Sequence, residues 1–99
     1  MFALTPPLLG ITESNPFFMP FYTYILISEM NNRRYFGSCE DLKKRLMYHN
    51  SGKVQSTKPY RPYRILYYEV YETKREALQR EKFFKTIDGY KYLKELKII

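Results

Sequence analysis

The 99-residue chain, with 44% hydrophobic residues, is long enough for one compact domain and too short for two independent cores. Its 17 Lys and Arg outnumber its 10 Asp and Glu, and the net charge of +7 suits a polyanion such as nucleic acid as well as it suits a soluble basic domain. The lone Cys39 excludes an intramolecular disulfide, and no apolar run nears the roughly 18 residues of a membrane span, so a reducing, cytoplasmic setting away from the membrane is expected.

The N-terminal part of the chain differs from the rest. Residues 1–20 contain four prolines and no sustained hydrophobic period, which predicts an extension that is flexible or lies over the surface of a domain formed by residues 21–99. That domain opens with YTYILIS, residues 22–28, whose β-branched and aromatic side chains predict a buried strand. After a polar turn, RRYFGS at residues 33–38 predicts a second strand that forms a hairpin with the first.

Helix signals follow the hairpin. Asp41 is a candidate N-cap for a helix that runs to about Asn50, where Ser51-Gly52 stops it. A basic loop then leads to a third strand, RILYYEVY at residues 64–71.

The C-terminal third is predicted to be helical. Thr73 and Glu76 form a capping box that starts a helix through about residue 85. Asp88-Gly89 is expected to break it, and a short amphipathic helix from 90 to about 96 follows. The order β-β-α-β-α-α predicts an α/β (α+β) domain in which helices flank a small three-stranded, antiparallel-type sheet.

The first predicted helix turns two polar side chains towards the sheet. On a helical wheel Leu42 and Leu46 mark the core-facing stripe, and Arg45 and His49 fall on that same stripe, four residues apart. A buried arginine needs a partner or an anion, because an unpaired buried charge is costly. The alternatives are an arginine whose stem lies on the sheet while its head reaches water, and a core histidine with satisfied nitrogens.

The second predicted helix places an acid on its inner side. Ala77, Leu78 and Phe84 define the inward stripe, Glu81 lies within it, and Arg80 points elsewhere. A carboxylate that faces the core is either a metal ligand or a salt-bridge partner, and Arg45 is the obvious candidate partner.

Polar groups on the hairpin complete a candidate site. Tyr24 and Tyr35 occupy alternating positions on the two strands, and Gly37 leaves room for another group to approach the backbone. A plain aromatic cross-strand pair is the alternative. The five groups predicted to converge offer proton-handling side chains, a guanidinium for phosphate and a carboxylate for a divalent ion, which is an inventory for phosphodiester cleavage. They are Tyr24, Tyr35, Arg45, His49 and Glu81. A Cys39–His49 thiol pair would leave Arg45, Glu81 and the basic field unexplained.

The same residues resemble the GIY-YIG nuclease superfamily, and most closely its small, single-domain bacterial members. The two halves of the signature stand as Tyr22-Thr23-Tyr24 and Tyr35-Phe36-Gly37, and Arg45, His49 and the run EALQREK at residues 76–82 follow in the same order. The resemblance covers about residues 21–95. Two positions depart from the signature: Tyr22 replaces its first glycine, and Phe36 replaces the isoleucine of its second half.

The resemblance implies a GIY-YIG fold and a role for each site residue. Glu81 would be the sole protein ligand of one Mg²⁺ or Mn²⁺. Tyr24 would help deprotonate the attacking water, and Tyr35 would position the water or the phosphate. Arg45 would stabilise charge on the phosphate oxygens, and His49 would assist proton transfer. Six further residues would hold the flanking nucleic-acid backbone: Asn50, Lys53, Lys58, Arg61, Arg64 and Lys85.

The sequence therefore predicts a metal-dependent endonuclease that hydrolyses DNA phosphodiester bonds with little sequence specificity, as in DNA repair or processing. RNA and branched DNA stay open as substrates, and a protein partner could supply specificity. The oligomeric state is left open. The first alternative is a nucleic-acid-binding module that keeps the fold but has little or no turnover. A protein-interaction module is the second, although it gives no reason for Arg45 and Glu81 to face inward.

Overall fold

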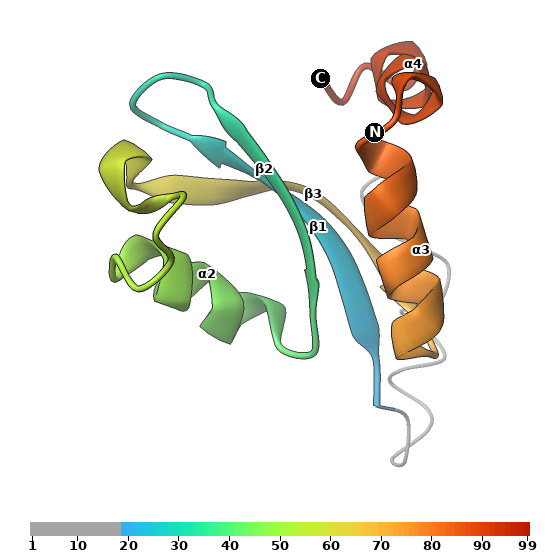
Figure 1. Ribbon diagram of the computed structural model, residues 1–99, viewed down its shortest axis with the longest axis horizontal. Coiled ribbons are helices and arrows are strands. Elements are labelled where there is room, and N and C mark those ends of the chain that lie inside the picture. The colour runs from blue at the N-terminus through green and yellow to red at the C-terminus, as the bar shows by residue number, and fades with distance from the viewer. Residues whose placement is uncertain (1–18) are drawn as a thin grey trace.

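The computed structural model describes residues 19–99, so most of the predicted extension, residues 1–18, lies outside the described residues. Three strands form one antiparallel sheet in the order β2-β1-β3, with β1 in the centre (Figure 1). The strands are β1 (Phe21–Ser28), β2 (Arg34–Cys39) and β3 (Tyr63–Tyr71). The helices are α2 (Leu42–Asn50), the short 3-10 helix η2 (Lys58–Tyr60), α3 (Lys74–Phe84) and α4 (Ile87–Glu95). The predicted α+β fold class and three-stranded sheet are confirmed.

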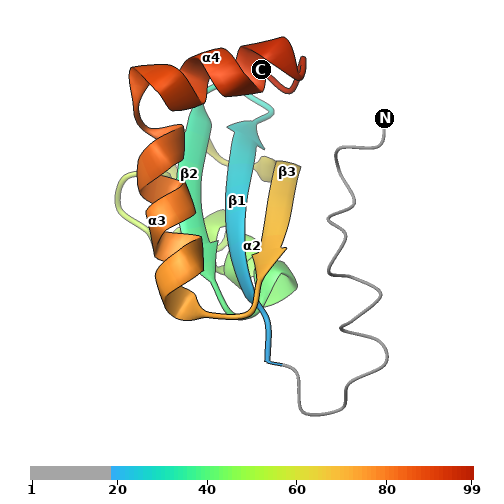
Figure 2. The ribbon, with the colours of Figure 1, turned by 90° about the vertical axis from the view of Figure 1, so that its right-hand side faces the viewer.

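The two faces of the sheet are covered by different helices. Helix α2 packs on one face, and α3 with α4 packs on the other, so the molecule has three layers (Figures 1 and 2). Because side chains alternate along a strand, Tyr24 and Leu26 of β1 point towards α2, while Thr23 and Ile25 point towards α3. All four are buried, as expected for a central strand covered on both faces. Throughout, the α2 face and the α3 face denote these two sides.

The predicted helix starts at Asp41 and Thr73 are confirmed. The Asp41 carboxylate accepts a hydrogen bond from the Lys44 backbone N–H at 3.0 Å, and the Thr73 hydroxyl accepts one from the Glu76 N–H at 3.2 Å. Helix α2 ends where predicted. Gly52, just beyond it, has a backbone φ of +86°, which residues other than glycine rarely adopt.

The predicted break at Asp88-Gly89 is wrong. Helix α3 ends earlier, and Thr86 starts α4 by accepting a hydrogen bond from the Gly89 N–H at 3.0 Å. Gly89 therefore lies inside α4, where it is buried against the end of α3. A Cβ there would lie 2.0 Å from the Phe83 carbonyl oxygen, so glycine at this position permits two helices to meet at a tight corner.

Apolar packing differs between the faces. The α3 face is built on Ile25, Tyr67, Phe84 and Leu93, whereas the α2 face packs Tyr24, Leu26 and Tyr63. Leu78, predicted to face inward, is 40% exposed, because the buried stripe of α3 runs through Ala77 and Phe84 instead.

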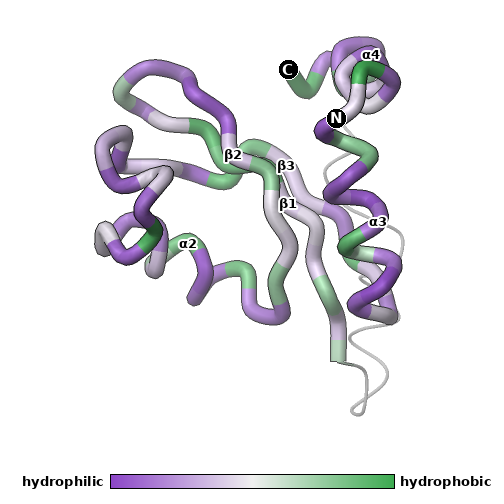
Figure 3. Tube along the Cα trace, in the orientation of Figure 1, coloured by the Kyte–Doolittle hydropathy of each residue, from purple (hydrophilic) through white to green (hydrophobic). Residues whose placement is uncertain are grey.

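Along the chain, hydrophilic residues dominate α3 and the β1–β2 turn, and the middle of the sheet is paler or hydrophobic (Figure 3). From residue 19 onward, no helix is both long enough and apolar enough to cross a bilayer.

A charged network that was not predicted from the sequence is buried on the α3 face. Glu69 of β3 is 8% exposed and accepts hydrogen bonds from the hydroxyls of Tyr67 and Tyr71. Arg80 of α3 donates to both oxygens of the same carboxylate, at 2.8 and 3.3 Å. The prediction that Arg80 points elsewhere is therefore wrong, since this ion pair draws its guanidinium between α3 and the sheet.

Candidate active site

The centre of the candidate site is the phenol of Tyr24, which lies across Gly37 of the edge strand. These two residues are direct partners in the β1–β2 ladder. A Cβ at Gly37 would come within 2.5 Å of the Tyr24 hydroxyl oxygen. Glycine is therefore needed for the ring to lie flat against β2, as the sequence suggested for a close approach at this position.

Arg45 and His49 of α2 both reach this phenol. The Tyr24 oxygen lies 3.1 Å from His49 Nε2, and Arg45 Nε donates to it at 3.4 Å. His49 is fully buried and Arg45 is partly exposed. The prediction that these two side chains face the sheet four residues apart is confirmed, and both contact the same atom.

The surroundings of His49 keep its ring neutral. Burial, with a smaller contribution from the nearby charge of Arg45, lowers the pKa of His49 from 6.5 to about 4. Tyr35 of β2 packs its ring against the imidazole, with ring centres 4.7 Å apart. At neutral pH the imidazole therefore keeps one nitrogen lone pair free to accept a proton.

Burial also controls the phenol. It raises the pKa of Tyr24 to about 12, and the hydrogen bond from Arg45 only partly offsets this increase. Tyr24 is 1% exposed and its oxygen is in contact with Arg45, so the phenol has almost no access to solvent in the free protein. Tyr24 is therefore a protonated phenol under ordinary conditions, with a proton acceptor and a cation both in contact with its oxygen.

Glu81 lies apart from these four side chains, on the α3 face of β2. Its Oε1 accepts a hydrogen bond from the Ser38 hydroxyl at 2.8 Å, and its Oε2 accepts one from Lys85 Nζ at 2.9 Å. The bridge to Arg45, which the sequence left open, is not formed. Ser38 directly follows Gly37 in the edge strand, so the carboxylate and the Tyr24 phenol are separated by one strand and approach it from opposite faces.

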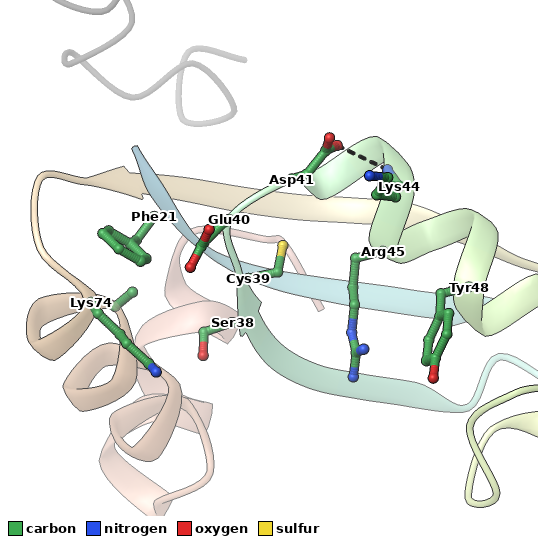
Figure 4. Close-up of a pocket in the computed structure, with 10 residues that line it drawn as sticks. Phe21, Ser38, Cys39, Glu40, Asp41, Lys44, Arg45, Tyr48 and Lys74 are labelled. Atoms are coloured by element: carbon green, nitrogen blue, oxygen red, sulfur yellow. Dashed lines mark hydrogen bonds between the residues drawn. The ribbon is translucent and has the colours of Figure 1, made fainter. Parts of the chain in front are cut away.

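A cleft of about 620 Å³ crosses this edge of the sheet and joins the two sides. Arg45 and Tyr48 of α2 lie along one side of the cleft, Ser38 and Cys39 line its floor on β2, and Lys74 of α3 closes the far side (Figure 4). The remaining lining residues are Phe21, Glu40, Asp41, Lys44 and Ala77. Three of the lining side chains are cationic and two are anionic. The thiol of Cys39 is not an activated nucleophile, because burial raises its pKa to about 11.

The residues predicted to hold a nucleic-acid backbone are placed in three different settings. Lys53, Lys58 and Arg61 are exposed in the connection between α2 and β3, and Arg64 is exposed at the start of β3, where it pairs with Glu29 at 3.6 Å. Lys85 lies on the α3 face, paired with Glu81. Asn50 is occupied by the backbone of Tyr63, whose N–H and C=O it bonds at 2.7 and 3.0 Å, so it fastens the end of α2 to β3.

Glu81 provides the only acidic group among the predicted site residues, and a divalent ion would have to bind there. Between residues 19 and 99, no three His, Cys, Asp or Glu side chains are grouped to hold a metal. A single carboxylate still fits magnesium, which keeps most of its water ligands and commonly takes one or two carboxylates. The Glu81 side chain is 20% exposed and Lys85 is 53% exposed, so the ammonium can move aside for a hydrated cation.

Two residues that contact the site were missed by the sequence reasoning. Thr57 is 1% exposed and lies 3.0 Å from the second ring nitrogen of His49, and Ser38 holds Glu81. Thr57 belongs to a loop without hydrophobic periodicity, so nothing in the sequence indicated its burial. Ser38 had a usable signal, because it alternates with Gly37 and must point to the opposite face of the strand.

Comparison with known proteins shows which family the chain belongs to. The profile of the GIY-YIG catalytic domain matches residues 20–92. A UPF0213 protein from Bacillus pumilus is 47% identical over 68 residues, which cover 65% of this chain and 69% of that protein. A UPF0213 protein from Staphylococcus saprophyticus is 39% identical over 74 residues, or 74% of this chain and 89% of that protein. The solution NMR structure of a UPF0213 protein from Bacillus halodurans is 29% identical and covers 80% of this chain and 86% of that one, with a TM-score of 0.48. The resemblance inferred from the sequence is thus confirmed, and the chain belongs to the GIY-YIG catalytic domain family.

Proposed function

We propose that this protein is a metal-dependent endonuclease that hydrolyses DNA phosphodiester bonds with little sequence specificity of its own. The observation that carries the proposal is the contact of one phenol oxygen with both a guanidinium and a neutral imidazole beside a cleft. Family membership and the net charge of +7 support a nucleic-acid substrate.

Proton transfer can follow the contacts already present. The Tyr24 oxygen takes a proton from the attacking water while its own proton passes to His49 Nε2, 3.1 Å away. A phenol with a pKa near 12 is a poor base when it must ionise alone, and the adjacent imidazole removes that requirement. Tyr35 packs on the imidazole and positions the phosphate or the water from the other side.

Arg45 has two successive tasks in this scheme. In the free protein its guanidinium side chain shields the Tyr24 oxygen. A phosphate in the cleft offers the guanidinium two charged oxygens in place of one neutral phenol, which draws it away and opens the phenol to water. The guanidinium then stabilises the charge that develops on the phosphate oxygens.

Glu81 would hold the divalent cation, Mg²⁺ or Mn²⁺, from across the edge strand. When bound, the ion supplies positive charge for the phosphate and the leaving oxygen. Ser38 would orient the carboxylate, and Lys85, which is paired with Glu81 in the free protein, would become available to a phosphate.

Affinity for nucleic acid would come from exposed cations that contact phosphates and do not distinguish one base from another. Lys53, Lys58, Arg61 and Arg64 lie in and after the loop that follows α2, and they suit phosphates along a strand. Asn50 has a structural role in the tie to Tyr63. Because phosphate contacts carry no sequence information, DNA structure or a partner protein would select the substrate, and RNA is an alternative that the same cations would accept.

One observation favours the alternative, a nucleic-acid-binding module with little turnover. In the free protein the Tyr24 oxygen is shielded and both Glu81 oxygens have partners, so two catalytic groups are masked. Dependence on a metal distinguishes this module from an enzyme, because phosphate binding alone needs no divalent ion.

The test is cleavage of supercoiled plasmid and of a short branched duplex, with Mg²⁺ or Mn²⁺ and with a chelator. Glu81→Gln is compared with Glu95→Gln, which removes the same charge from an exposed position on α4. We expect wild type and Glu95→Gln to cut only with metal, and Glu81→Gln to lose about 100-fold or more in rate while binding DNA normally. Salt-sensitive binding without metal-dependent cutting would establish the binding module instead.

A further inference from the structure

His49 is held from two sides, and the partner on its far side has no part in the scheme above. Its Nδ1 lies 3.0 Å from the hydroxyl of Thr57, a buried residue of the loop after α2. We propose that Thr57 is a positioning residue that fixes the ring proton of His49 on Nδ1 and so keeps Nε2 free to accept the Tyr24 proton. The catalytic consequence rests on the proposed nuclease function, whereas the position of the ring proton does not.

Hydrogen bonds link Val54, Thr57, His49, Tyr24 and Arg45 in a row. The Val54 end of this row fixes the direction of the bond between Thr57 and His49. The Thr57 hydroxyl donates to the backbone carbonyl of Val54 at 3.3 Å, and a carbonyl can only accept. With its single proton used there, the Thr57 oxygen is left to accept from His49 Nδ1–H. A neutral imidazole has one N–H, so Nε2 must carry the lone pair.

The opposite end of the row supports the same order. Arg45 can only donate, so the Tyr24 oxygen accepts from its Nε at 3.4 Å. Among residues 19–99 the Tyr24 oxygen bonds only Arg45 and His49, and its own proton therefore goes to His49 Nε2. The reverse order would bring two donors to one phenol oxygen and leave the Tyr24 proton without an acceptor.

The local structure holds Thr57 in place for this task. Its backbone N–H and that of Lys58 both donate to the Val54 carbonyl, at 3.1 and 2.9 Å, which closes a tight turn. The His49 ring has the rings of Tyr35 and Tyr63 as neighbours, with ring centres 4.7 and 6.5 Å away, which restricts its rotation towards another acceptor. In water a neutral histidine favours the proton on Nε2, and the Thr57 contact would reverse that preference.

The proton position is measured directly by ¹⁵N NMR of the imidazole at neutral pH. The chain has a single histidine, so its ring signals need no assignment. We expect wild type and Thr57→Ser, which keeps the hydroxyl, to show a protonated Nδ1 and an unprotonated Nε2. Thr57→Val removes the acceptor at nearly constant shape, and the proton should move wholly or partly to Nε2. A protonated Nε2 in wild type, or an unchanged Nδ1–H in Thr57→Val, would overturn the proposal.

Cleavage gives an independent reading of the same variants. We expect Thr57→Val to lose roughly 10- to 100-fold in kcat with little change in KM, and Thr57→Ser to stay near wild type. Should wild type not cut any substrate, the nuclease proposal fails while the NMR result still decides the role of Thr57. Should Thr57→Val not fold, Thr57→Ala, which also lacks the hydroxyl, takes its place in the NMR comparison.

Discussion

The two faces of the sheet each bury polar side chains, but their hydrogen-bond networks end differently. On the α3 face, Glu69 is closed in by Tyr67, Tyr71 and Arg80, and the Arg80 guanidinium is itself covered by aromatic rings 4.7–5.0 Å away. On the α2 face, the row from Val54 through His49 and Tyr24 ends at Arg45, beside the cleft. The first, closed network ends in a guanidinium packed against aromatic rings, whereas the second, open network ends in a cation that lines the cleft.

Breaking the closed network should have the largest effect on folding. Glu69→Gln removes the charge opposite Arg80 at nearly constant volume and leaves a largely buried guanidinium without its counter-ion. We expect a loss of about 3 kcal/mol in the free energy of unfolding, measured by urea denaturation, with DNA binding unchanged under native conditions. Adding Arg80→Met to Glu69→Gln should recover part of the loss, because no unpaired charge is then left buried. Equal stability of Glu69→Gln and wild type would show that the α3 face does not depend on this ion pair.

The open network should make stability depend on pH. Because burial lowers the pKa of His49 from 6.5 to about 4, the unfolded chain binds a proton between these values and the folded chain does not. The stability from this group is present above pH 6.5 and decreases as the pH falls towards 4. We expect a relative loss of about 2 kcal/mol for wild type between pH 7 and pH 5, measured against His49→Gln, which does not titrate. Parallel pH curves for the two proteins would contradict the expected pKa of His49.

Adding a single methyl group at Gly37 of the edge strand tests how closely the open network depends on the position of the Tyr24 phenol. Gly37→Ala places a methyl group 2.5 Å from the Tyr24 oxygen, and the buried ring must move to relieve the clash. We expect a loss of about 1–3 kcal/mol in stability and a clear drop in cleavage. In a Tyr24→Phe background the cost should be smaller, because the nearest atom is absent. Full activity of Gly37→Ala would mean that the position of the phenol is not critical.

The smallest effect is expected from an exposed cation. Arg64→Met removes one exposed charge, whose ion-pair partner Glu29 is also exposed, so the melting temperature should hardly change. If Arg64 contacts a phosphate, the slope of log K against log salt for DNA binding should fall by about one. Arg75→Met, at an exposed position on α3, serves as the matched control and should leave the slope unaltered. Identical slopes for the two variants would remove Arg64 from the binding surface.

Much of the fold could be predicted because its signals are local. Asp41 and Thr73 are caps that act within one helical turn, and the positions of Arg45 and His49 relative to Leu42 follow from helical geometry alone. The boundary at Gly89 was misread, since glycine there is required by contact with another helix and not by a turn.

The candidate site was harder to predict because it depends on which face each helix covers. A helical wheel shows that Glu81 faces the sheet, but it does not show that α3 packs on the side opposite α2. Four of the five predicted groups therefore cluster, and Glu81 approaches from across β2. Glu69 carried a signal that went unused, because strand alternation places it on one face with Tyr67 and Tyr71.

The edge position of β2 has a mechanical consequence. Gly37 supports the Tyr24 phenol on one side of this strand, and the next residue, Ser38, holds Glu81 on the other. The strand is hydrogen-bonded in the sheet along one side only, so no strand on its other side opposes a small rotation about its own axis. Such a rotation would move the supports of the phenol and the carboxylate in opposite directions at once. The two halves of the proposed site would therefore shift together, because both rest on the backbone of residues 37 and 38.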